Sequence, residues 1–185
     1  MDHAEDVKRR LLDGNSMFSK AADACMMAKL AERQEPFVAI LACSDSRVDP
    51  EKVFNLSLGS AFVVRTAGNC ASDACSLGSL EYAVAHLGVK AVLVMGHTRC
   101  GAVRTSCECC DIDNLKAVMS DLDAAKTSMD PLDAKDPDKV SEHNVKAQVR
   151  RLTARSQVIG EAVRKGDLAV YGAMFDIRTG EVRFV

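Results

Sequence analysis

The sequence has 185 residues, enough for one buried core and short for two, so we expect a single domain over residues 1–185. Apolar residues make up 48% of the chain and charged residues 27%, a globular composition that excludes a disordered or fibrous protein. The net charge is -2 and basic residues form no run, which argues against a nucleic-acid partner.

The hydropathy pattern argues against a membrane protein. No apolar run approaches the roughly 18 residues of a membrane span, and the first ten residues are too charged for a secretory signal. We therefore expect a cytoplasmic location without membrane binding. The eight cysteines then belong to a reducing compartment, where thiols bind metals, react or pack instead of forming a disulfide framework.

The first third of the chain predicts helices followed by a buried strand. Residues 1–33 carry apolar side chains at helical spacing with an interruption near Gly14, which indicates an N-terminal arm of two amphipathic helices. After Pro36, residues 37–43 form a continuous apolar run of strand length. Such runs are typical of strands that are buried on both faces of a parallel sheet.

The middle of the chain predicts a crossover unit. Residues 61–67 and 91–96 are two further buried-strand runs, and the segment 76–88 between them has a helical pattern. Residues 115–125 also have a helical pattern. The segment 127–138 contains two prolines and several aspartates, and we expect an exposed connection there.

The last third predicts more helix and two strands. Apolar positions from Val140 to Val163 have helical spacing, and Gly166 is a natural helix end. Residues 168–175 and 181–185 then form strand-like runs around a turn. The chain as a whole predicts an α/β fold, with a mainly parallel central β-sheet flanked by helices.

Reactive side chains follow two of the predicted strands. Cys43, Asp45 and Arg47 come at the end of the first strand, while His97 and Cys100 follow the third. In open α/β sheets, sites gather beyond the carboxyl ends of the strands. Two thiolates and an imidazole suit Zn²⁺, and three protein ligands leave a fourth position open, as in catalytic zinc sites.

The spacing of Asp45 predicts a second part of this site. Asp45 lies two residues from Cys43 and two from Arg47, so a tight turn could bring its carboxylate to the metal and the guanidinium to the carboxylate. An arginine partner would keep Asp45 ionised, so that it accepts a hydrogen bond from zinc-bound hydroxide. Each motif alone is weak, because a cysteine that ends a strand is usually a core thiol. The prediction therefore depends on the two strand ends together.

Several motifs of the sequence resemble the β-class carbonic anhydrases. The tail segments NVKAQVRRL and YGAMFDIRTGEV are similar as well, and the resemblance covers nearly the whole chain from Gln34 onward. It thins out between Cys107 and Asp138. The four motifs that carry it are CSDSRV at 43–48, FVVRTAGN at 62–69, LEYAV at 80–84 and GHTRCG at 96–101.

The resemblance implies a reaction and the residues that perform it. The reaction is the reversible hydration of carbon dioxide to bicarbonate and a proton by zinc-bound hydroxide. Cys43, His97 and Cys100 would be the zinc ligands. Asp45 would orient the hydroxide, and Arg47 would hold Asp45.

The resemblance also implies a substrate pocket shared between subunits. Gln34, Phe62, Tyr82 and Gly101 match pocket positions, and in the family the glutamine and tyrosine commonly come from the partner subunit. Ordinary core packing is an equal alternative for Phe62 and Tyr82. We accordingly expect a homodimer or a higher even oligomer, with the N-terminal helices packing on a partner subunit.

One departure from the family concerns a second bicarbonate site. Some members carry a tryptophan three residues before the first cysteine ligand and use it with an arginine in an inhibitory site. This chain has Ile40 there and no tryptophan, although Arg65 matches the arginine. We therefore expect the open form of the site, in which Asp45 pairs with Arg47.

Two other functions stay open from the sequence. The same zinc site could hydrolyse carbonyl sulfide or carbon disulfide. The size of the pocket would decide between these substrates and carbon dioxide. The chain could also be a non-catalytic zinc-binding or redox-sensing protein, because several thiols have no assigned role. His86 and His143 receive no role either. The unassigned thiols are Cys25, Cys70, Cys75, Cys107, Cys109 and Cys110.

Overall fold

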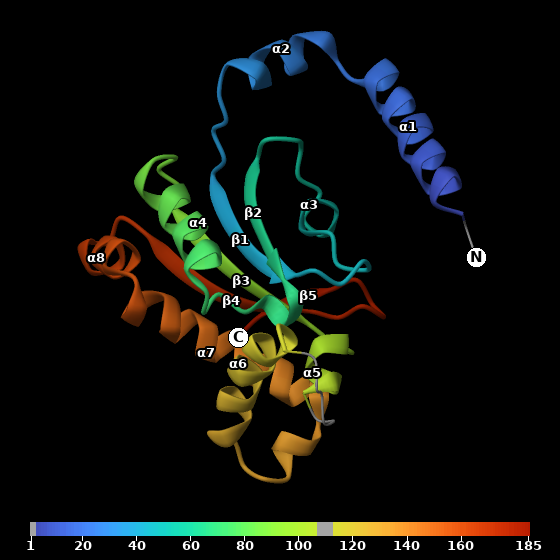
Figure 1. Ribbon diagram of the computed structural model, residues 1–185. Coiled ribbons are helices and arrows are strands. Elements are labelled where there is room, and N and C mark those ends of the chain that lie inside the picture. The colour runs from blue at the N-terminus through green and yellow to red at the C-terminus, as the bar shows by residue number, and fades with distance from the viewer. Residues whose placement is uncertain (1–2, 107–112) are drawn as a thin grey trace. The chain divides into compact units, whose positions relative to one another are not determined.

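The computed structural model describes residues 3–106 and 113–185 (Figure 1). The chain divides into two units, Met1–Gln34 and Glu35–Val185. Among the described residues, no helix combines the length and the apolar character needed to cross a membrane. Three cysteines without an assigned role lie outside the described residues: Cys107, Cys109 and Cys110.

The N-terminal unit contains two helices, α1 (Ala4–Ala21) and α2 (Ala24–Glu32), neither of which has a buried residue. Two helices were predicted here, but the predicted break near Gly14 is wrong, since Gly14 lies inside α1. A glycine inside a helix costs only about 1 kcal/mol, which the rest of the helix can offset. The break comes at Asp23 instead, whose side chain accepts the backbone N–H of Met26 at 2.6 Å and so begins a new helix.

The second unit is built on a five-stranded sheet with the order β2-β1-β3-β4-β5. The pairs of β1 with β2, β1 with β3 and β3 with β4 are parallel, and only β5 is antiparallel to its neighbour. This confirms the predicted α/β fold with a mainly parallel sheet. The strands are β1 (Val38–Cys43), β2 (Ala61–Thr66), β3 (Ala91–His97), β4 (Ala169–Phe175) and β5 (Val182–Phe184).

The sheet is covered on both faces, as the continuous apolar runs predicted. On one face, Leu41 and Val94 belong to a core that includes residues of α4, α7 and α8. On the other face, Ile40 and Met95 pack with residues of α3 and of the segment that follows it. The helical elements of this unit are α3 (Pro50–Val53), η1 (Ala67–Asn69), α4 (Ala74–Ala85), α5 (Gly101–Thr105), α6 (Leu115–Thr127), η2 (Asp133–Lys135), α7 (Pro137–Arg155) and α8 (Gln157–Lys165).

Helix α7 lies close against β3 and β4, and two glycines make this possible. A Cβ atom on Gly96 would lie 2.5 Å from a methyl group of Val145, and one on Gly172 would lie 2.8 Å from the same side chain. At the start of α7, the carboxylate of Asp136 accepts the N–H of Asp138 at 2.9 Å and so caps the helix. The hydroxyl of Ser141 then holds the N-terminal part of α7 to the end of β3, since it donates to the carbonyl oxygen of His97.

We expect Gly96→Ala to lower the free energy of unfolding by about 1 to 3 kcal/mol, because the added methyl group overpacks the contact between β3 and α7. Urea denaturation measures this change. Gly78→Ala in α4 is the matched control, since its Cβ would meet no atom within 4 Å. A helix-interior glycine replaced by alanine should leave stability unchanged or raise it by up to about 1 kcal/mol. Equal stability of the two variants would contradict the close packing.

Candidate metal centre

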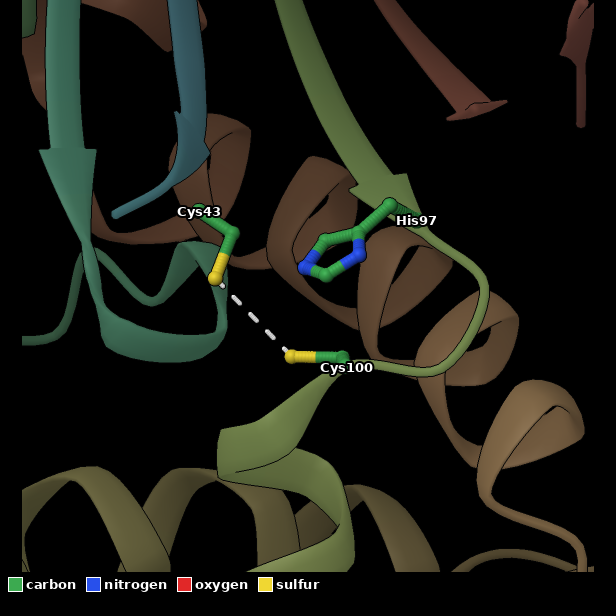
Figure 2. A group of neighbouring side chains, drawn as sticks. All are labelled: Cys43, His97 and Cys100. Carbon is green, nitrogen blue, oxygen red and sulfur yellow. Dashed lines mark hydrogen bonds between the residues drawn. The ribbon is translucent and has the colours of Figure 1, made fainter. Parts of the chain in front are cut away.

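The site lies where the order of the strands in the sheet reverses. From β1 the chain runs outward to β2 on one side and then returns to β3 on the other, so the carboxyl ends of β1 and β3 flank the switch point of the sheet. Crevices at such points are the usual sites of open α/β folds. Cys43 is the last residue of β1, His97 is the last residue of β3, and Cys100 directly precedes α5. Their side chains point toward one another (Figure 2).

The three side chains have the geometry of a metal site. The sulfur atoms of Cys43 and Cys100 are 3.8 Å apart, and one ligand atom from each of the three residues lies within 4.8 Å of the others. Two sulfurs bound at 2.3 Å to a tetrahedral zinc ion would be about 3.8 Å apart. The distance between the two sulfurs therefore fits Zn²⁺.

The imidazole of His97 is prepared to bind a cation. Its Nδ1 atom lies 3.0 Å from the backbone carbonyl oxygen of Thr98, which fixes the proton on Nδ1 and leaves the lone pair on Nε2. Nε2 is buried and has no hydrogen-bond partner among the described residues. A buried polar atom without a partner is costly, and a metal ion would satisfy it.

The two thiols act as a pair. A hydrogen bond from Cys100 lowers the pKa of the Cys43 thiol to about 4, although burial opposes this shift. The same bond, together with burial, raises the pKa of Cys100 well above its usual range. The backbone N–H of Gly68 also donates to the Cys43 sulfur at 3.4 Å. The hydrogen bond between the two sulfurs therefore favours a thiolate at Cys43, and a divalent cation would favour a second one at Cys100.

Asp45 and Arg47 form the predicted pair beside the ligands. Nε of Arg47 donates to Oδ1 of Asp45 at 2.9 Å, and Nη2 donates to Oδ2 at 2.7 Å. The hydrogen bonds from Arg47 hold the pKa of Asp45 well below its usual range. Oδ2 of Asp45 lies 3.9 Å from Nε2 of His97, so an ionised carboxylate stands next to the metal position.

Arg65 holds the turn that carries this pair. Its guanidinium donates to the backbone carbonyl oxygens of Cys43 at 3.0 Å, Asp45 at 2.7 Å and Val48 at 2.5 Å. Sequence reasoning considered Arg65 only as half of a second bicarbonate site. Its contacts in the structure are instead with the backbone of the turn.

Sequence reasoning missed a set of polar residues on α7 that bind the loops of the site. Asp138 accepts the N–H of Arg99, and Ser141 donates to the carbonyl oxygen of His97. Asn144 donates to the carbonyl oxygen of Gly68, and Gln148 accepts the N–H of Ala71. Their spacing of three, three and four residues follows one helix face, and this periodicity was the available signal. We call these residues the α7 polar stripe: Asp138, Ser141, Asn144 and Gln148.

Two of the residues expected to form the substrate pocket, Phe62 and Tyr82, do not lie at Cys43, His97 and Cys100 of their own chain. Phe62 and Tyr82 are neighbours, with ring centroids 6.0 Å apart, and Tyr82 is 44% exposed. Phe62 pairs with Ala39, which is four residues before Cys43, so it lies roughly 13 Å along the strand from the ligand end. Gly101 begins α5 next to Cys100. Gln34 belongs to the N-terminal unit, and its role stays a prediction.

The other described thiols differ from the ligand pair. Cys70 packs in the same apolar cluster as Cys43 and Cys100, and burial raises its pKa to about 12. Cys70 therefore stays protonated at neutral pH, and its Sγ donates to the carbonyl oxygen of Gly68 at 3.4 Å. Cys25 and Cys75 are free and exposed.

The fold and the site define a class of protein, and comparison defines the family. An open α/β sheet with two cysteines and one histidine at its switch point is the arrangement of a catalytic zinc protein. A family model described as carbonic anhydrase matches residues 38–182. The chain belongs to the β-class carbonic anhydrase family, whose members use zinc.

Individual relatives cover nearly the whole chain. A carbonic anhydrase of Pseudomonas aeruginosa is 33% identical over 94% of this chain and 86% of its own length. The solved β-carbonic anhydrase of Coccomyxa is 30% identical, with a TM-score of 0.81 over 100% of this chain and 86% of that one. A tetrameric β-carbonic anhydrase of Sordaria macrospora is 25% identical, with a TM-score of 0.84 over 98% and 97% of the two chains.

We expect Cys43→Ala and Cys100→Ala each to weaken zinc binding by more than about 100-fold, since even residues behind the ligands affect metal affinity 10- to 100-fold. Competition with a chromophoric chelator measures the affinity. Cys70→Ala is the matched control, because it removes a buried thiol from the same cluster. It should bind zinc as the unaltered protein does. Loss of zinc from the Cys70 variant alone would contradict the ligand set.

Proposed function

We propose that this protein catalyses the reversible hydration of carbon dioxide to bicarbonate and a proton, with Cys43, His97 and Cys100 as zinc ligands. The observation that carries the proposal is the Asp45–Arg47 pair, with Oδ2 of Asp45 3.9 Å from the free nitrogen of His97. A site that merely stores zinc has no use for an ionised carboxylate beside an open coordination position. The membership in the carbonic anhydrase family supports the same reaction.

The chain's own residues prepare and orient the attack. Bound Zn²⁺ supplies the Lewis acidity that lets water attack carbon dioxide near neutral pH. Asp45 stays ionised because of Arg47, so its carboxylate can only accept hydrogen bonds. It accepts one from the attacking oxygen and thereby turns a lone pair of that oxygen toward the carbon atom. Arg47 keeps the carboxylate in this orientation through two parallel hydrogen bonds.

The comparisons do not favour the two alternatives from the sequence. The matched family model and the curated relatives are carbonic anhydrases, and none of the relatives reported above is named for carbonyl sulfide or carbon disulfide. A non-catalytic zinc or redox protein is not favoured either, because the complete Asp45–Arg47 pair is present.

We also propose that two copies of the chain complete each substrate pocket. Phe62 lies too far along the sheet to reach the ligands of its own chain, and Tyr82 packs beside it. This placement supports a role for both residues in the pocket of a partner subunit. Helices α1 and α2 leave large apolar side chains uncovered, Leu11 being 70% exposed and Phe18 50%. A second copy would cover this face. The Sordaria relative is a tetramer, which agrees with an even assembly.

A cytoplasmic location completes the proposal. The five described cysteines are all free, and two of them are needed as metal ligands. Free thiols persist in reducing compartments, whereas oxidising ones favour disulfides.

We expect the zinc-loaded protein to hydrate carbon dioxide and Asp45→Asn to lower kcat by roughly 100-fold, because the amide no longer acts purely as an acceptor. A stopped-flow pH-indicator assay measures the rate. Asp49→Asn is the matched control, since Asp49 caps α3 nearby and has an exposed lysine partner. No rate above buffer with carbon dioxide, or a faster reaction with carbonyl sulfide, would reject the proposed reaction.

We expect sedimentation of the protein as an even multiple of its 19.9 kDa chain. Leu11→Gln with Phe18→Gln should shift the particle toward smaller assemblies, because it removes apolar area from the exposed face of α1. Lys20→Gln on the opposite face of the same helix is the control and should leave the particle unchanged. A fully active 19.9 kDa monomer would contradict the shared pocket.

A further inference from the structure

The loop between the ligands His97 and Cys100 contains a strained residue. Arg99 has a φ angle of +57°, in the left-handed region that glycine adopts readily and arginine rarely does. Its side chain is exposed, so side-chain packing does not enforce this conformation. Strained backbone at a site persists only when its surroundings hold it.

Both polar groups of the Arg99 backbone are held. Its N–H donates to Oδ1 of Asp138 at 2.6 Å, and its carbonyl oxygen accepts a hydrogen bond from Nη2 of Arg47 at 3.1 Å. Arg47 is the residue that fixes Asp45, and the same Nη2 atom binds Oδ2 of Asp45. The contacts thus run continuously from Asp138 through the Arg99 backbone and Arg47 to Asp45.

Asp138 is not needed to begin its own helix. The cap of α7 is Asp136, whose carboxylate accepts the N–H groups of Asp138 and Lys139. Asp138 lies in the first helical turn, and its carboxylate is directed to Arg99 instead. A charged acceptor forms a stronger hydrogen bond than a neutral one, which suits a group that must hold strained backbone.

The ligand loop is fixed at several points, and among the described residues it is Asp138 alone that holds Arg99 from the helix side. Thr98 is fixed by the end of β4, since its N–H donates to the carbonyl oxygen of Phe175 at 3.0 Å. Ser141 binds the carbonyl oxygen of His97 at 3.0 Å. Within residues 3–106 and 113–185, the N–H and the carbonyl oxygen of Arg99 are held by Asp138 and Arg47 respectively.

We propose that Asp138 is a positioning residue that holds Arg99 in its left-handed conformation, and that it thereby sets both the place of the Cys100 sulfur and the orientation of the Asp45–Arg47 pair. The proposal rests on the proposed function, because that function gives Cys100 and Asp45 their roles. Asp138 acts through the backbone of Arg99 and touches neither metal nor substrate.

The first experiment compares Asp138→Ala, Asp138→Asn and Asp136→Ala. Asp138→Ala should weaken zinc binding on the order of tenfold, as the loss of a residue behind a metal ligand does, and should alter the visible spectrum of the cobalt-substituted protein. It should also lower kcat roughly tenfold, the effect of losing a charge-assisted hydrogen bond. Asp138→Asn keeps an acceptor oxygen and should recover part of each loss.

Asp136→Ala is the control for a merely structural role of this helix end. It removes the cap of α7 and should lower the melting temperature more than Asp138→Ala does, yet leave the cobalt spectrum and zinc affinity unchanged. Equal losses of zinc affinity in the Asp136 and Asp138 variants would overturn the proposal. So would a zinc affinity and cobalt spectrum of Asp138→Ala that match the unaltered protein.

The second experiment tests the strain directly with Arg99→Gly. Glycine adopts the left-handed conformation without penalty, so loss of the Asp138 contact should cost less in its presence. The zinc-affinity loss from Asp138→Ala should therefore be smaller in the Arg99→Gly background than in the unaltered protein. An equal loss in both backgrounds would overturn the proposed role of strain.

These measurements separate the two proposals. Failure of the unaltered protein to hydrate carbon dioxide rejects the proposed function, whatever the variants do. Zinc affinity and the cobalt spectrum report on the ligand loop without any turnover, so they test the role of Asp138 even in that case.

Discussion

The parallel pairing of β1 with β3 is the constraint on which the site depends. It brings the last residues of two strands, Cys43 and His97, to the same edge of the sheet although 54 positions separate them in sequence. The two strands are direct neighbours, about 4.8 Å apart. The apolar side chains of both strands fill cores on the two faces, so a slip in the pairing would disrupt the packing on both of them. Packing that stabilises the fold therefore also fixes the distance between two of the proposed ligands.

Helix α7 connects the same core to the loops of the site. Val145 packs against the sheet where Gly96 leaves room, while the α7 polar stripe binds backbone atoms of the loops around the ligands. Ser141 and Asn144 are fully buried, so their partners cannot be replaced by water without loss. Because the stripe contacts backbone atoms, it fixes where the loops run and leaves their side chains free for chemistry.

The sequence was informative where the chemistry is local or periodic. Asp45 and Arg47 are two residues apart and their pairing was predicted, as were the buried strands from their apolar runs. The α7 polar stripe was missed because its partners are backbone groups far away in the sequence. The helix-face spacing of its residues was visible, but it did not reveal what they bind. The helix break at Asp23 was missed because Gly14 seemed the stronger signal, although a capping aspartate begins a helix more decisively than one glycine ends it.

Charge balance explains how these charged groups can lie next to one another. Two thiolates 3.8 Å apart repel, so the pair of Cys43 and Cys100 keeps one proton unless a divalent cation neutralises both. With Zn²⁺ the two thiolates and the metal sum to zero. The remaining anion, Asp45, is balanced by Arg47. Each part of the site is then neutral by itself, and the ionised carboxylate beside the metal needs no further cation to remain stable.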